Sequence, residues 1–271
     1  MQKKDDNEAY VREVHDKGLA FDLRTMSRRK MLAGFTGGVA AVAVGGGMFF
    51  DRSTSYADTT CDLTEVPDET NGPYPADGTN GIDIRTAEGV VRSDITTSFG
   101  DASGVAEGIP LTVNITVEDL ECTPLSGVAV YIWHCDRDGN YSLYSTAIAD
   151  ENYLRGIQEA DASGTVSFTT IFPGCYLGRW PHIHFEVYAS LDDATSGAGA
   201  IVKTSQLGFP EDVCDEAYAT DGYSSSVSNL AQITLATDNV FSDGYDQQMA
   251  TVTGSATEGY TASLTIAVDE S

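Results

Sequence analysis

The feature that most constrains the fold is a series of short segments in which apolar and polar residues alternate between turn-forming residues. Residues 111–117 alternate with a period of two, and residues 128–134 are rich in β-branched and aromatic side chains. Both patterns are typical of β-strands. Beyond residue 57, no segment of ten or more residues shows a helical period, so we predict an all-β fold, an antiparallel β-sandwich with long loops. Further strands are expected at residues 165–170, 182–188, 201–207 and 262–268.

The segments between the expected strands indicate one domain rather than two. Residues 58–105 contain many turn residues and are expected to form a loop-rich N-terminal wrap. Residues 211–250 form a long polar excursion, and an excursion of that length in a compact domain is usually functional or flexible. Since the chain has no internal repeat, we predict a single sandwich domain over residues 58–271.

The first 57 residues have the features of an export leader. The motif SRRKML at residues 27–32 resembles a twin-arginine signal, an apolar run follows over residues 31–50, and SYA at residues 55–57 would suit a signal peptidase. We therefore expect residues 1–57 to direct export by the twin-arginine route, to the cell surface or the extracellular space. The alternative is an uncleaved N-terminal anchor. Contact with a membrane is expected only through this region, and only if it is not cleaved.

Charge is distributed unevenly along the chain. The sequence has 15 Lys and Arg residues against 41 Asp and Glu residues, a net charge of -26. Nine of the basic residues lie in the first 57, so the remainder has a net charge of -28, and Lys203 is its only lysine. This balance argues against nucleic acid or anionic lipid as partners, because both require clustered basic residues. It favours a surface adapted to concentrated salt, as in halophiles, with an ordinary acidic secreted protein as the alternative.

The cysteine content permits disulfides but does not define them. The five cysteines contain no Cys-x-x-Cys pair and match no zinc pattern, so we interpret them as structural. An odd number leaves at least one thiol unpaired, and the pairing stays open. The five are Cys61, Cys122, Cys135, Cys175 and Cys214.

Two histidines form the clearest candidate for a chemical site. His182 and His184 are separated by one residue within an expected strand, so their side chains point to the same face. Two imidazoles that converge in this way can start a transition-metal site. Taken alone, the pair is also compatible with two surface histidines.

The sequence around these histidines adds further motifs. Residues 172–184 read FPGCYLGRWPHIH, residues 133–142 read WHCDRDGNYS, and residues 70–74 read TNGPY. With these motifs, residues 59–268 resemble the intradiol ring-cleaving dioxygenases, the non-haem Fe(III) family that includes catechol and protocatechuate dioxygenases. The chain looks most like the exported, single-domain members that carry a twin-arginine leader.

The resemblance implies a ferric iron held by two tyrosinates and two histidines. Carried over by motif, the ligands would be Tyr141 after the Gly-Asn turn, Tyr176 after Pro-Gly, and the pair His182 and His184. Tyr176 and His184 would be axial, and Tyr141 and His182 equatorial. The donor types agree with this assignment, because phenolate oxygens are hard anionic ligands that favour Fe(III).

The resemblance also implies a reaction. A catechol-type substrate would be cleaved by O2 between its two hydroxyls, giving a muconate-type diacid. Tyr176 would leave the iron and act as a base, and Arg179 would stabilise negative charge on the substrate. Gln206 matches the glutamine that the family places beside the ligands. The particular catechol and the oligomeric state stay open.

Two other functions compete with this interpretation. The strand and turn pattern also fits a transthyretin-like or carboxypeptidase-regulatory sandwich, a non-catalytic binding module, which leaves the tyrosines and the His-x-His pair without a role. A zinc or copper site could use His182 and His184 alone. His134 has no ligand role that we can assign, and Trp133 and Trp180 are expected to be packing residues.

Overall fold

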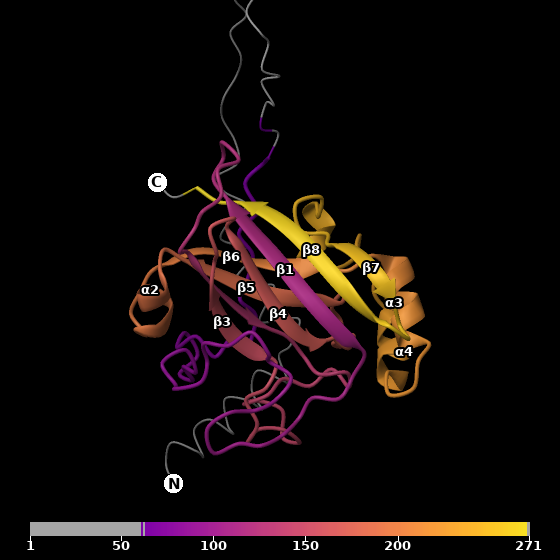
Figure 1. Cartoon of the computed structure of the whole chain (residues 1–271). Helices are drawn as coiled ribbons and strands as arrows, with labels where there is room; N and C mark the ends of the chain where they lie inside the picture. The colour runs from indigo at the N-terminus through magenta and orange to yellow at the C-terminus, as the bar shows by residue number, and fades with distance from the viewer. Residues whose placement is uncertain (1–60, 62, 270–271) are drawn as a thin grey trace, which may run out of the picture.

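The chain forms two four-stranded sheets that pack face to face (Figure 1). A computed structural model describes residue 61 and residues 63–269, and the predicted leader over residues 1–57 lies outside these described residues. The first sheet has the order β4 (Thr165–Ile171), β1 (Pro110–Glu118), β8 (Gly259–Ala267) and β7 (Thr251–Ser255). The second has the order β3 (Arg155–Glu159), β2 (Ala129–Trp133), β5 (His182–Tyr188) and β6 (Ile201–Gly208).

The predicted β-sandwich is confirmed, and each of the six expected strands corresponds to an observed one. All strand pairs are antiparallel except β1 and β8, which run parallel. The sequence analysis missed β3 and β7. β3 begins with Arg155 and Gly156, and β7 is a largely exposed edge strand, so neither shows the apolar alternation that identified the others.

The space between the two sheets is filled by the inward side of each strand. Along β1 every second residue is fully buried, as the alternation predicted. Each large aliphatic side chain removed from water in this way stabilises the fold by about 1.5–3 kcal/mol. The central contributors from β1, β2, β4 and β5 are Leu111, Val113, Ile115, Val117, Val130, Ile132, Phe168, Ile183 and Phe185.

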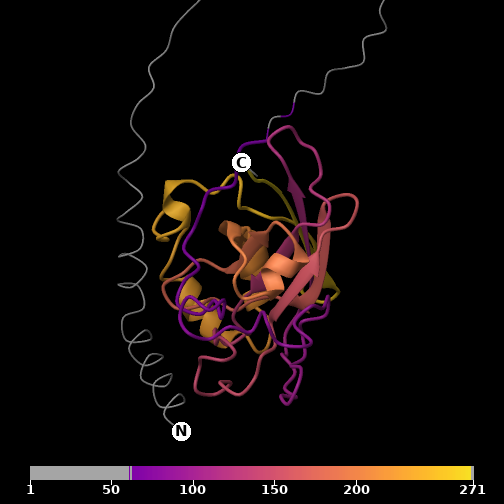
Figure 2. The ribbon, with the colours of Figure 1, turned by 90° about the vertical axis from the view of Figure 1, so that its left-hand side faces the viewer.

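The outer face of the second sheet is also buried, and it carries the polar residues. Because side chains alternate along β5, His182, His184, Glu186 and Tyr188 share the face opposite to the core. The predicted N-terminal wrap covers this face, and in Figure 2 its indigo and magenta segments run along the outside of the sheets. Arg85 anchors the wrap, donating a 2.6 Å hydrogen bond from Nη1 to the Tyr188 hydroxyl. The polar face is therefore enclosed by protein rather than by solvent.

The polar excursion over residues 211–250 contains short helices. They are α3 (Glu211–Tyr218), α4 (Ser224–Leu230) and a 3-10 turn at Phe241–Asp243, while α2 (Leu191–Thr195) lies between β5 and β6. None reaches ten residues, in agreement with the missing helical period. Within the described part of the chain, no helix has both the length and the apolar character needed to span a membrane.

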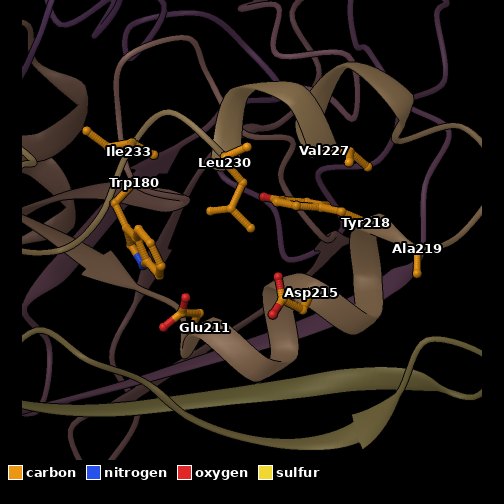
Figure 3. Close-up of a pocket in the computed structure, with 9 residues that line it drawn as sticks. Trp180, Glu211, Asp215, Tyr218, Ala219, Val227, Leu230 and Ile233 are labelled. Carbon is orange, nitrogen blue, oxygen red and sulfur yellow. The ribbon is translucent and has the colours of Figure 1, made fainter.

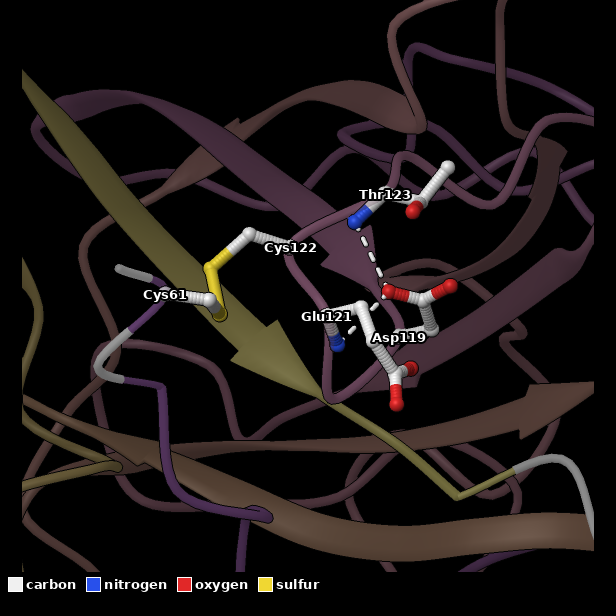
Figure 4. Close-up of a disulfide and its surroundings, with 5 residues drawn as sticks. All are labelled: Cys61, Asp119, Glu121, Cys122 and Thr123. Carbon is white, nitrogen blue, oxygen red and sulfur yellow. Dashed lines mark hydrogen bonds between the residues drawn. A yellow bond between two sulfur atoms is a disulfide. The ribbon is translucent and has the colours of Figure 1, made fainter. Parts of the chain in front are cut away.

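One disulfide joins Cys61 to Cys122 (Figure 4). Cys122 lies in a turn that is closed by Asp119, whose Oδ1 accepts the N–H groups of Glu121 at 2.9 Å and Thr123 at 2.7 Å. The bridge ties the start of the described chain to this turn. The other three cysteines are free and buried: Cys135, Cys175 and Cys214.

Candidate metal and catalytic site

The predicted histidine pair converges as expected from its strand. His182 and His184 are both 3 % exposed, and their Nε2 atoms lie 3.0 Å apart. His184 also stacks on Trp133, directly opposite on β2, with ring centroids 4.8 Å apart and planes inclined by 4°. Packing thus fixes the orientation of His184, and Trp133 is a packing residue as predicted.

The two predicted tyrosines join the histidines from separate turns. The Tyr141 ring centroid lies 5.8 Å from that of Tyr176 and 6.4 Å from that of His184. Gly174 allows the two turns to approach, because a Cβ at this position would lie 2.6 Å from the Arg137 carbonyl oxygen. The Pro-Gly motif before Tyr176 therefore has a steric purpose, which is to pack its turn against the one that leads to Tyr141.

A hydrogen bond determines which ring nitrogen of His182 carries the proton and which one can bind a metal. Its Nδ1 lies 2.5 Å from the Trp180 carbonyl oxygen, which can only accept, so Nδ1 carries the proton and Nε2 keeps its lone pair. Metal-binding histidines are held in this way in other proteins. Burial, followed by the charge of Arg179, lowers the pKa of His182 to about 3. Burial likewise lowers the pKa of His184 well below its ordinary value, so both imidazoles are neutral at pH 7.

The Tyr141 hydroxyl can ionise, and so coordinate a metal, only beside a strongly charged cation. Burial raises the pKa of its hydroxyl well above the ordinary value of 10, and that hydroxyl has no hydrogen-bond partner among the described residues. A phenolate at this position would therefore require a nearby cation of high charge. Two phenol oxygens with two neutral imidazoles fit a ferric ion. The described residues hold no group of three or more His, Cys, Asp and Glu suited to a metal, so the donor set depends on the tyrosines.

Arg179 and Gln206, which were also nominated from the sequence, lie in contact beside this cluster. Arg179 is buried and donates from Nη2 to Gln206 Oε1 at 2.6 Å. Gln206 is paired with His184 across β5 and β6, and its own Nε2 donates to the Thr70 carbonyl at 3.1 Å. All six residues nominated from the sequence are therefore brought to one region on the outer face of the second sheet.

Two further residues of the site were not assigned a role from the sequence. The hydroxyls of Tyr74 and Tyr176 lie 3.3 Å apart, and the Tyr74 ring is 4.8 Å from that of Tyr141. Asp238 pairs with Arg179, with 3.0 Å between Oδ2 and Nε. The TNGPY motif marked the position of Tyr74 without a function. Nothing in an acid-rich sequence distinguishes Asp238.

His134 lies outside the cluster. Its Nδ1 donates to the Cys135 carbonyl at 2.8 Å, and its Nε2 lies 2.7 Å from the Thr170 hydroxyl. Both nitrogens are therefore occupied by protein partners. Burial lowers the pKa of His134 to about 4, which keeps the ring neutral. These contacts give His134 a structural role, and the sequence had suggested no ligand role for it.

A separate cavity of about 380 Å³ lies between α3, α4 and the chain that follows (Figure 3). Trp180 forms one wall, Leu230 and Ile233 line the apolar side, and the carboxylates of Glu211 and Asp215 project from α3. None of the six nominated residues lines it. We therefore place the candidate site at the Tyr–His cluster rather than in this cavity.

Comparison with known proteins shows that the chain is similar to dioxygenases. The model of a dioxygenase family, described as "Dioxygenase", matches residues 87–220, which include all six nominated residues. Chlorocatechol 1,2-dioxygenase from Rhodococcus opacus is 33% identical over 93 residues, 27% of this chain and 36% of that protein. Hydroxyquinol 1,2-dioxygenase from Corynebacterium glutamicum is 32% identical over 109 residues, 33% of this chain and 35% of that protein. The matches thus span about a third of the length of these curated relatives.

Solved structures support the same grouping. An intradiol ring-cleavage dioxygenase from Tetranychus urticae superposes with a TM-score of 0.55 and 27% identity, covering 68% of this chain and 88% of that one. The dioxygenase domain of a carbohydrate-binding fusion from a Streptomyces species gives a TM-score of 0.50 at 24% identity, covering 77% and 100%, and shows the fold alone. Together these comparisons place the matched part of the chain, residues 87–220, with the intradiol ring-cleaving dioxygenases.

Proposed function

We propose that this protein cleaves the ring of a catechol-type substrate between its two hydroxyls, using O2 and a ferric ion and giving a muconate-type diacid. The observation that carries the proposal is the convergence of two tyrosines and two neutral histidines, with the His182 proton fixed on Nδ1. Those residues would hold the iron. When bound, the ferric ion would draw electron density from the coordinated catechol and so prepare the ring for attack by O2.

The two tyrosines differ in a way that assigns their roles. Tyr141 is 2 % exposed and enclosed by neighbouring rings, whereas Tyr176 is only partly buried, and its hydroxyl faces that of Tyr74. Tyr176 is therefore the more accessible of the two, and the Tyr74 hydroxyl lies 3.3 Å from its own. We assign Tyr176 the role of accepting a proton from the incoming catechol, and Tyr141 the role of a ligand that stays in place.

Arg179 supplies fixed positive charge beside the substrate position. Its Nε and Nη2 groups are bound to Asp238 and Gln206, while Nη1 has no hydrogen-bond partner among the described residues. A buried cation that is already oriented interacts strongly with charge that develops during a reaction, because little solvent screens it. Arg179 would thus stabilise negative charge on the substrate oxygens as the ring is attacked.

Export to an oxidising compartment is part of the proposal. The Cys61–Cys122 disulfide supports it, since disulfides are rare in the reducing cytosol. The strongly acidic composition after residue 57 agrees with a protein that works outside the cell, and with a source rich in salt.

The proposal is tested by oxygen uptake of the iron-loaded protein with catechol, hydroxyquinol and chlorocatechol, together with the mass of each product. We expect consumption of one O2 per substrate and a diacid that has gained both oxygen atoms. An aldehyde product would place the cleavage outside the two hydroxyls, and no uptake with any catechol would support a non-catalytic module. Tyr245→Phe, at an exposed tyrosine, is the matched control for Tyr141→Phe and Tyr176→Phe.

A further inference from the structure

Asp238 is a fully buried carboxylate that the family match does not cover. It lies between α4 and the 3-10 turn, beyond the matched residues 87–220, and has 0 % exposure. A buried carboxylate is costly unless its oxygens are paired and hydrogen-bonded. The partners of Asp238 therefore indicate what it is for.

Those partners divide between the two carboxylate oxygens. Oδ2 accepts the N–H of Trp180 at 2.7 Å and the Nε–H of Arg179 at 3.0 Å. Oδ1 accepts the N–H groups of Val240 at 2.8 Å and Phe241 at 3.1 Å, and the Arg179 Nη2 atom lies 3.4 Å away. Four close donors fix the carboxylate, which in turn fixes one edge of the guanidinium.

We propose that Asp238 is a positioning residue. It holds Arg179 so that the Nη1 donors of Arg179, which are not used by Asp238 or Gln206, point toward the substrate. This inference rests on the proposed function. Gln206 holds Nη2, so Asp238 and Gln206 together leave the guanidinium little freedom to turn. Preorganised charge of this kind contributes more to catalysis than charge that must reorient during the reaction.

An asparagine cannot replace this carboxylate. If its amide oxygen faces the N–H groups of Val240 and Phe241, its NH2 group faces the N–H groups of Arg179 and Trp180, and the opposite rotamer creates the same conflict on the other side. Asp238→Asn should therefore release Arg179. A purely structural role predicts a loss of stability with no dependence on Arg179.

The experiment compares Asp238→Asn in the wild type and in an Arg179→Gln background, with exposed Asp246→Asn as the matched control. In the wild-type background we expect kcat to fall at least about tenfold. The affinity for 4-nitrocatechol, titrated without O2, should weaken in the same direction. In the Arg179→Gln background both quantities should change less than about twofold, because the residue through which Asp238 acts is gone.

The outcomes separate the inference from the proposed function. Equal losses in the two backgrounds, or an unchanged kcat in Asp238→Asn, would overturn the inference. If Asp238→Asn does not fold, Asp238→Glu keeps the charge and displaces it by one methylene, and should lower kcat without altering the visible iron spectrum. A kcat equal to wild type in that variant would also refute it. A wild-type protein that binds iron but consumes no O2 with any catechol would instead refute the proposed function.

Discussion

Replacing His134 with glutamine should change how the stability of the protein depends on pH. In the folded chain burial lowers the pKa of His134 to about 4, against an ordinary value of about 6.5 in the unfolded chain. The unfolded chain therefore binds a proton at a pH where the folded chain does not. The contribution of the neutral ring to stability is complete above pH 6.5, and it is lost as the pH falls from 6.5 toward 4.

The size of the effect follows from the two pKa values. At pH 5 almost every unfolded molecule carries the proton on this ring, whereas only about a tenth of the folded molecules do. Because the unfolded state binds more protons, the free energy of unfolding is about 2 kcal/mol lower at pH 5 than at pH 7. Glutamine has no titrating group. It can still hydrogen-bond to the Thr170 hydroxyl, which His134 Nε2 contacts at 2.7 Å.

Urea unfolding of the wild type and His134→Gln at pH 7 and pH 5 measures this difference directly. The wild type should lose about 2 kcal/mol more than the variant over that interval. The carboxylates, His182 and His184 are common to both proteins, so their contributions cancel. If the stability difference between the two proteins is the same at both pH values, the argument from burial is refuted.

Three other changes have defined outcomes. Gly72→Ala should weaken iron binding, because Gly72 has a φ of +68° and a Cβ there would lie 3.2 Å from His184 Cε1. The measurement is the iron content after dialysis, and a full iron content would contradict this steric argument. Reducing the Cys61–Cys122 disulfide, which spans 61 positions, should lower the free energy of unfolding by about 4 kcal/mol, and an unchanged urea midpoint would refute that value. Molar salt should raise the melting temperature, since it screens repulsion within a chain of net charge -26. The same melting temperature in dilute buffer and in molar salt would argue against salt adaptation.

The strands that the sequence predicted are those with one buried face and regular alternation. β5 was expected at residues 182–188 and begins and ends there, and β1 exceeds its expected bounds by one residue at each end. β3 was missed because the buried Arg155 appears polar in the sequence. Its guanidinium is accommodated only by tertiary partners, the Pro75 carbonyl and Ser142, which no local pattern indicates.

The candidate site shows the same division between local and tertiary information. Tyr176, His182 and His184 lie within nine residues, so a short motif was enough to nominate them. Asp238 lies 59 residues beyond its partner Arg179, in a segment that the sequence analysis described only as a long polar excursion. Its burial depends on how the excursion folds back over Trp180, and this is information that only the structure contains.

The most direct test of the account is the visible absorption spectrum of the iron-loaded protein. Charge transfer from two tyrosinates to Fe(III) should give a broad visible band and a burgundy colour. Tyr141→Phe and Tyr176→Phe should each shift or weaken this band, while Tyr245→Phe leaves it unchanged. A protein that contains stoichiometric iron and is colourless would contradict the assignment of Tyr141, Tyr176, His182 and His184 as the ferric site.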